Sequence, residues 1–153
     1  MKKAIRKIAL GGLILFVLIQ FYQPARNING QVSPAHIEKV YSMPLTVSNI
    51  LHTSCYDCHS NNTNYPWYSY IQPARAFLDS HITEGKKELN FSEFGNYSNR
   101  KQESKLRAIA KQVSSGEMPL NSYTAMHKNA MLSELQKKAL EDWISECLNS
   151  NTE

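Results

Sequence analysis

The pentapeptide Cys55-Tyr56-Asp57-Cys58-His59 constrains the fold of this chain more than any other feature of its sequence. Two thiols three positions apart lie about one turn apart on a helix, and an imidazole follows the second thiol directly. The chain has 3 cysteines, and the third, Cys147, lies near the C-terminus. An odd number of cysteines, two of them in one short motif, does not indicate a disulfide framework. The motif therefore predicts a helical turn that presents two thiols and an imidazole to one ligand.

Three chemistries use such a motif. In covalent haem attachment, the two thiols form thioether bonds with the vinyl groups of one haem, and the following histidine binds the iron. A redox dithiol usually stands near a βαβ pattern, which this sequence lacks. A zinc site takes its further ligands from elsewhere in the chain rather than from the position directly after the second cysteine. The residues favour one haem c, covalently held by Cys55 and Cys58 and ligated by His59, with zinc and a redox dithiol as open alternatives.

The second nitrogen of the His59 ring is expected to donate a hydrogen bond to a backbone carbonyl, because such a partner fixes the tautomer of a ligating histidine. The loop that contains Pro66 follows the motif and is a candidate source of this acceptor.

The spacing of apolar residues predicts an all-α fold, since no alternating strand pattern of useful length and no internal repeat occurs. Helices are expected over residues 33–42 and 47–51, from Pro73 to an end marked by Gly85 and the stretch 89–91, over 99–115, and from Ser133 onward, where Ser133 and Gln136 form a capping box. The third helix would carry an apolar face with Ala74, Phe77, Leu78, His81 and Ile82, and the fourth one with Leu106, Ile109, Ala110 and Val113. Gly116 stands where a C-terminal helix cap belongs. Segments 60–70 and 116–131 are expected to be mostly loop.

The first 22 residues combine a basic start with an apolar run. Lys2, Lys3, Arg6 and Lys7 precede the run from Ile8 to Tyr22, which has the length of a signal-peptide core and is short for a membrane span. Residues 1–22 are therefore expected to be a cleaved export signal or an uncleaved membrane anchor, followed by a linker over 23–32 and a c-type haem-binding domain over 33–150. In both cases the domain is exported to the periplasmic side of the cytoplasmic membrane.

The formal net charge of +4 comes largely from those four N-terminal cations, so the charge gives little support to nucleic-acid binding.

A second axial ligand for the iron is expected downstream of the motif. Met118 stands between Gly116 and Pro119, before the final helix, and a loop methionine beside a proline can form a rigid arm. His81 is the main rival, and His127 is a weaker one. Met126 and Met131 are assigned to core packing, and His36 and His52 to structural or exposed positions.

Several other residues near the motif have two interpretations. Tyr65, Trp67, Tyr68 and Tyr70 follow it closely and can either exclude water from a haem edge or pack ordinarily. Arg75 can pair with a haem propionate or take part in helix packing. Trp143 is expected in the core, and Cys147 is expected to be a buried thiol without a redox or metal role.

Residues from Ser33 to Leu148 resemble the haem-binding domain family of bacterial exported proteins, which is similar to small class I c-type cytochromes. The segments that carry this resemblance are Cys55 to Asn62, Tyr65 to Tyr68, Gly85-Lys86, Leu89 to Ser92, Gly116 to Pro119 and the closing helix from Leu132 to Ile144. The resemblance implies covalent haem c with His59 as the proximal and Met118 as the distal ligand. It also implies a small c-type-cytochrome-like bundle, here of four or five short helices around the haem and preceded by an N-terminal hydrophobic helix.

These features together predict single-electron transfer in the cell envelope through one His/Met-ligated haem. The alternative is a haem-based sensor or ligand-binding module with an open distal site. An enzyme of the peroxidase type is not expected, because the chain offers one haem motif and no obvious distal acid–base pair. The expected partner is a redox protein of unknown identity; nucleic acid is not expected, and a membrane is expected only if the N-terminal segment is retained.

Overall fold

The computed structural model describes residues 1–150, and within them the chain is all-α. Eight α-helices and three short 3₁₀ helices follow one another, and an isolated bridge between Ile28 and Asn62 is the one β-type pairing in this range. The α-helices are α1 (Lys2–Ile19), α2 (Ile37–Val40), α3 (Leu45–Ser54), α4 (Tyr56–His59), α5 (Ala74–Glu88), α6 (Asn99–Ser114), α7 (Asn121–Met126) and α8 (Glu134–Ser150). The 3₁₀ helices are η1 (Trp67–Tyr70), η2 (Phe91–Asn96) and η3 (Lys128–Ala130). The predicted fold class is confirmed as all-α, but the predicted number of four or five helices was too low.

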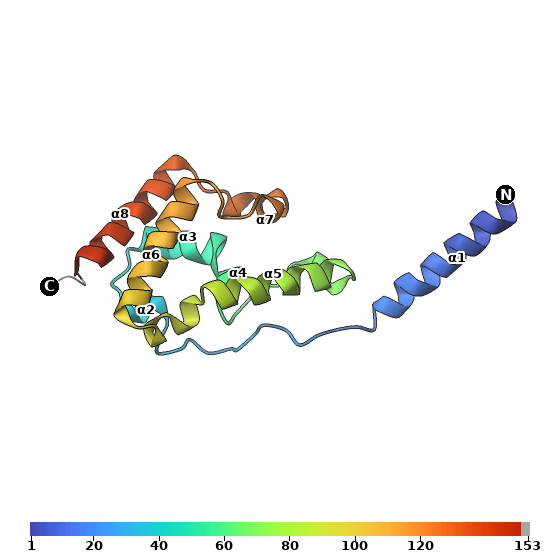
Figure 1. Ribbon diagram of the computed structural model, residues 1–153, viewed down its shortest axis with the longest axis horizontal. Helices are drawn as coiled ribbons and strands as arrows, with labels where there is room; N and C mark the ends of the chain where they lie inside the picture. Colours follow the sequence, from blue (N-terminus) through green and yellow to red (C-terminus); the bar gives the residue numbers. More distant parts are fainter. Residues whose placement is uncertain (151–153) are drawn as a thin grey trace.

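The core lies where α3, α6 and α8 pack together, with α2 against η2 beside them (Figure 1). Leu106 and Val113 of the predicted α6 stripe are buried, and so are Leu140 and Ile144 of α8. Burying one such side chain stabilises the fold by about 1.5–3 kcal/mol. Trp143 is also buried, as predicted, and its indole donates a 3.0 Å hydrogen bond to the Ser42 carbonyl. The periodic apolar positions therefore explain why these three helices meet.

Helix ends confirm the capping signals in the sequence. The Ser133 amide donates to Oε1 of Gln136 at 2.9 Å, and the Gln136 amide donates to Oγ of Ser133 at 3.3 Å, which is the reciprocal pairing of a capping box. Gly116, which follows the C-cap residue Ser115 of α6, has a φ of 74°. This left-handed conformation, which suits glycine, ends the helix as expected.

The segment after Gly116 differs from the predicted loop. It contains α7 and η3, because Thr124 and Ala130 are buried and fix two short turns against the body. Helices this short have too few residues for a periodic apolar pattern, so the sequence did not indicate them.

Helix α5 begins after Pro73 and ends at Glu88, directly before Leu89, so both ends lie where they were predicted. Its predicted single apolar face is divided: Leu78 and Ile82 are buried, whereas Phe77 is 61% exposed. The division matters for the site, because the exposed part of this face borders a cavity.

Helix α1 projects away from the body and buries none of its residues (Figure 1). Its end is nevertheless fixed: Nε2 of Gln20 donates to the Gln72 carbonyl at 3.2 Å, and the Gln72 amide donates to Oε1 of Gln20 at 2.9 Å. Among the described helices, none combines the length and apolar character that crossing a membrane requires. The roles of residues 1–22 as export signal or anchor stay predictions.

Candidate functional site

The Cys-x-x-Cys-His segment folds into a tight helical turn at the junction of α3 and α4. The amides of Cys58 and His59 both donate to the Cys55 carbonyl, at 3.2 and 3.0 Å. This turn directs both thiols and the imidazole toward one cavity of about 360 Å³, here called the His59 cavity. Its volume lies within the range of small-molecule and cofactor sites.

Backbone carbonyls fix the orientation of the His59 ring. Nδ1 lies 2.9 Å from the Gly85 carbonyl oxygen and 3.1 Å from that of Leu89, so Nδ1 carries the proton and donates it. In the neutral ring Nε2 then keeps its lone pair, which is the form that binds a metal. Burial lowers the pKa of His59, opposed by these two hydrogen bonds, and thereby favours the neutral form. The acceptors were predicted near Pro66, but they lie at the end of α5 because that helix packs directly on the motif.

Gly85 permits this packing. A Cβ atom on Gly85 would lie 2.8 Å from the Cys58 carbonyl oxygen, closer than side-chain carbons approach backbone oxygens. The absence of a side chain therefore allows α5 to come near enough for its carbonyls to reach His59.

Both motif thiols are held in the protonated form. Burial raises the pKa of Cys55 to about 12. Burial and the neighbouring Asp57 carboxylate raise the pKa of Cys58 to about 11. A redox dithiol depends on a lowered thiol pKa, so these values count against that interpretation. Zinc needs about four ligands, and residues 1–150 contain no group of three or more cysteine, histidine or acidic side chains placed to hold a metal ion.

Met118 borders the same cavity as His59, from the loop between α6 and α7. Its amide donates to the Gln112 carbonyl at 3.1 Å, which ties this loop to the last turns of α6. Elements distant in the sequence thus bring a thioether, an imidazole and two thiols to one site. Cys55, Cys58, His59 and Met118 are the four residues for which the sequence predicted a common role.

His81 also borders this cavity, so the geometry brings both predicted distal ligands to it. Nδ1 of His81 lies 2.9 Å from the Phe77 carbonyl of its own helix, which leaves Nε2 as an acceptor in the neutral ring.

His127, the weaker candidate for a distal ligand, is engaged elsewhere, because its Nε2 lies 2.8 Å from the Tyr68 hydroxyl. Met126 and Met131 are each 58% exposed, so their assignment to core packing was wrong.

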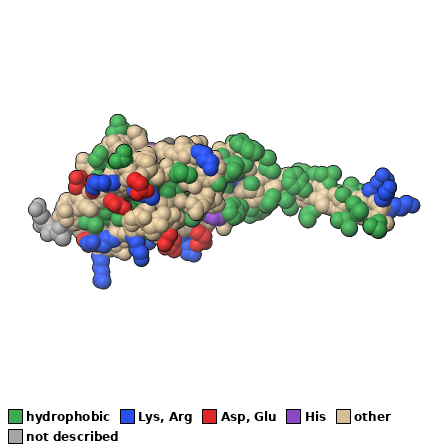
Figure 2. All heavy atoms as spheres, turned by 90° about the horizontal axis from the view of Figure 1, so that it is seen from above, with side chains coloured by type: hydrophobic (Ala, Val, Ile, Leu, Met, Phe, Trp, Pro, Cys, Tyr) green, Lys and Arg blue, Asp and Glu red, His purple; other side chains and the backbone are tan. Residues whose placement is uncertain are grey.

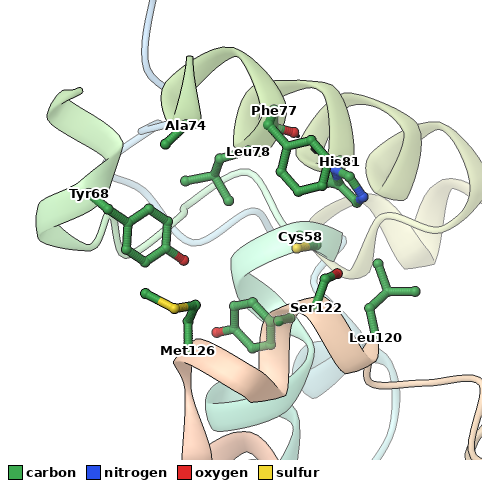
Figure 3. A pocket seen from close by; sticks show the side chains of 10 residues that line it. Cys58, Tyr68, Ala74, Phe77, Leu78, His81, Leu120, Ser122 and Met126 are labelled. Carbon is green, nitrogen blue, oxygen red and sulfur yellow. Dashed lines mark hydrogen bonds between the residues drawn. The ribbon is translucent and has the colours of Figure 1, made fainter. Parts of the chain in front are cut away.

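A second cavity of about 300 Å³ adjoins the first, and the two share Cys58, His81, Leu120 and Tyr123 (Figure 3). Figure 3 shows Phe77 and His81 of α5 on one side of this Phe77 cavity and Leu120, Ser122 and Met126 on the other, with the Cys58 sulfur between them. Tyr123 of α7 joins its side of the cavity to the motif, because its hydroxyl donates to Oδ2 of Asp57 at 2.7 Å. Burial, assisted by this hydrogen bond, raises the pKa of Tyr123.

The sequence did not single out Tyr123 or Lys105. Lys105 of α6 contributes the positive charge on the wall of the His59 cavity, beside Glu84 and Glu88. Its Nζ lies 3.9 Å from Glu88. Lys105 directly precedes Leu106 in the sequence. This position could have indicated that Lys105 lies at the edge of the apolar face of α6.

Arg75 does not face the cavity. Its side chain is 1% exposed, forms an ion pair with Asp79 and donates to the Pro24 carbonyl at 3.0 Å, so its role is packing rather than propionate binding.

Of the four aromatic residues after the motif, Tyr68 borders the Phe77 cavity, whereas Trp67 and Tyr70 are exposed at 71% and 56%. Tyr65 contacts the linker, where its hydroxyl accepts from the Asn27 amide at 2.8 Å.

The positions of the remaining histidines and the burial of Cys147 are as expected. His36 is buried and caps α2 by accepting from the Glu38 amide, while His52 is exposed and lies 3.3 Å from Glu38. Cys147 is a buried free thiol, and burial raises its pKa to about 11.

The donors of the His59 cavity suit a haem: an oriented imidazole, a thioether and two uncharged thiols, set among apolar side chains such as Phe91, Ile109 and Val113. Comparison with known proteins agrees. The family model described as a haem-binding domain matches residues 14–146. No curated protein and no solved structure gives a significant match. The chain therefore belongs to the haem-binding domain family.

Proposed function

We propose that this protein carries one haem c, bound covalently through Cys55 and Cys58, and transfers single electrons in the cell envelope. The observation that supports it most is the meeting of both thiols, the His59 imidazole and Met118 at one cavity. Each thiol would add across one vinyl group: the sulfur bonds to one carbon and the thiol hydrogen goes to the other. This addition consumes no oxidant, and it starts from the protonated thiols that burial favours here.

In this proposal His59 is the proximal ligand. The Gly85 and Leu89 carbonyls hold its ring by Nδ1, so Nε2 would be free to bind the iron without a change of tautomer. A fixed ligand costs little reorganisation when the charge of the iron changes, which suits an electron carrier. When bound, haem supplies the one-electron couple of its iron, and the protein supplies ligands, orientation and exclusion of water.

Met118 is the proposed distal ligand. It stands on a loop that α6 anchors through the Gln112 carbonyl, and thioether ligation raises a haem potential without adding a group that titrates. His81 is the alternative at the same cavity.

Two matched variants distinguish these ligands. Met118→Ala should remove the methionine-to-iron charge-transfer band of the oxidised protein and leave the haem attached, whereas His81→Ala should leave that band unchanged. A band that survives Met118→Ala would overturn the distal assignment, and loss of it in His81→Ala alone would point to an indirect effect of α5.

A haem-based ligand-binding module is the second candidate, and the Phe77 cavity is the observation that favours it. This cavity adjoins the proposed haem site and has room for a small ligand. Rapid binding of carbon monoxide to the reduced wild type would support this function over electron transfer. A six-coordinate protein that resists carbon monoxide would support the electron carrier, and absence of hydrogen peroxide turnover would agree with a protein that is not an enzyme.

A further inference from the structure

We propose that the surface formed by Trp67, Tyr70 and Ile71, together with Phe21 and Tyr22 at the end of α1, rests on a lipid bilayer. We call it the aromatic surface. Its five side chains are exposed at 71%, 56%, 43%, 81% and 66% in this order. The inference concerns the chain with α1 attached and does not depend on the chemistry of the haem site.

The short helix η1 presents two of these rings together. Side chains three residues apart lie above one another on a 3₁₀ helix, so Trp67 and Tyr70 share one face. Between residues 65 and 77 the one charged side chain is Arg75, which is buried. The exposed part of this stretch is therefore uncharged and rich in aromatic groups. Tryptophan and tyrosine favour the boundary between lipid and water, because their rings are apolar and their polar atoms reach water.

Hydrogen bonds hold this surface in a fixed relation to α1. Gln72, 2% exposed, donates from Nε2 to the Tyr22 carbonyl at 2.7 Å, and its backbone pairs with the Gln20 side chain. The Arg26 guanidinium lies 4.4 Å from the centre of the Tyr70 ring and donates to its hydroxyl at 3.1 Å. The aromatic surface is thus continuous with the end of α1.

Helix α1 indicates lipid rather than protein as the partner. Positions 13 to 18 are six consecutive apolar residues, each between 45% and 63% exposed. Successive residues point about 100° apart, so these six cover every side of the helix. A protein groove would cover one side and leave the others in water, whereas a bilayer can cover apolar side chains on every side of a helix that enters it, without the helix crossing it. Figure 2 shows apolar side chains gathered where the body meets α1 and continuing along it, with lysine and arginine at the far tip.

Charge complements this arrangement. Lys2, Lys3, Arg6 and Lys7 lie at the start of α1, and exposed Arg26 stands beside Tyr70. Cations at both ends of an apolar helix can approach the phosphates of anionic lipids. The haem domain would then be held at the bilayer in one orientation, by its aromatic surface as well as by α1.

Hydroxyl-radical footprinting of the purified full chain tests this without any substitution, using vesicles of phosphatidylcholine and phosphatidylglycerol. Oxidation of Trp67 and Tyr70 should fall several-fold when vesicles are added. Met131, which is 58% exposed and lies outside the aromatic surface, is the internal control and should keep its rate. A chain that binds vesicles with Trp67 still oxidised at its original rate would overturn the proposal, and so would a chain that does not bind.

A pair of variants tests the energetic contribution of the rings. Trp67→Ser with Tyr70→Ser should lower the vesicle partition coefficient by about tenfold or more, because two aromatic side chains lose their apolar contact. The matched control, Leu45→Ser with Leu135→Ser, removes residues that are 77% and 83% exposed elsewhere and should leave the coefficient unchanged. Equal partition of both double variants would overturn the proposal. Unchanged haem absorbance in either variant keeps this result separate from the function of the haem site.

Discussion

The Tyr123 hydroxyl donates a 2.7 Å hydrogen bond to Oδ2 of Asp57, which joins α7 to the interior of the Cys-x-x-Cys-His segment. Tyr123 also stacks on His127, with ring centres 4.3 Å apart, and His127 in turn pairs with the Tyr68 hydroxyl. The helix that follows the Met118 loop is therefore fixed to the thiol-bearing turn by a side-chain contact across 66 positions. The predictions below begin with this contact.

Tyr123→Phe should loosen the Met118 arm without detaching the haem. Leaving a carboxylate oxygen without its donor costs about 1–3 kcal/mol. In this protein the loss weakens the contact between α7 and the motif. The expected result is a weaker methionine-to-iron band and faster binding of carbon monoxide to the reduced protein. Tyr41→Phe is the control, because Tyr41 donates a similar 3.0 Å hydrogen bond to Gln102 away from the cavity. If both variants lose equal stability and neither changes the band, Tyr123 does not position the arm.

Gly85→Ala should lower the melting temperature and disturb His59. The added Cβ would meet the Cys58 carbonyl oxygen at 2.8 Å, so α5 must move away and its carbonyls with it. Overpacking of this kind costs about 1–3 kcal/mol. Calorimetry measures the loss, and the visible spectrum reports the changed imidazole. Gly12→Ala is the comparison, because a Cβ there would meet no atom within 4 Å beyond its chain neighbours and the nearby backbone of its own helix. Equal melting temperatures for the two variants would contradict the close approach.

Two leucines of α8 offer a matched test of the core. Leu140→Ala should lower the free energy of unfolding by about 2–5 kcal/mol, because Leu140 is 0% exposed and its removal leaves a cavity. Leu135→Ala, at a position 83% exposed on the same helix, should change it by less than about 0.5 kcal/mol. Urea denaturation followed by circular dichroism measures both. Similar losses at the two positions would show that α8 packs by another face.

The pH dependence of stability should contain a contribution from His36. Burial lowers its pKa below the ordinary value of 6.5, against the opposing charge of Glu38. The unfolded chain therefore takes up a proton first as the pH falls. This contribution is fully present above pH 6.5 and is lost as the pH falls from that value through the lower pKa of the folded state, by at most about 1.4 kcal/mol per pH unit.

His36→Asn checks this slope. Asparagine can still accept at the start of α2 but does not titrate. The variant should therefore lose less stability than the wild type between neutral and mildly acidic pH. If the free energy of unfolding fell equally with pH in the variant and the wild type, His36 would not couple folding to protonation.

Local sequence patterns predicted the parts of the fold that depend on local interactions. The α6 stripe, the Ser133–Gln136 capping box and the glycine after α6 each need only a few neighbouring residues, and all three were found. Helices α7 and η3 were missed because one buried residue in each, Thr124 and Ala130, fixes them through contacts with distant parts of the chain.

The predicted site shows the same division. The motif specified which residues face the cavity, but the Gly85 and Leu89 carbonyls that orient His59 lie 26 and 30 positions away. No local pattern encodes such a pairing, so the acceptor was sought near Pro66 instead. Arg75 was also ambiguous in the sequence, and its burial against Asp79 and the linker carbonyls excludes it from the cavity.

The mass of the intact protein, purified from a host that matures c-type haem, tests the central claim most directly. The account predicts a polypeptide heavier by one haem, with the adduct retained after denaturation and lost in a variant carrying both Cys55→Ser and Cys58→Ser. A colourless wild-type chain, or one whose haem is released on denaturation with both thiols free, would contradict it.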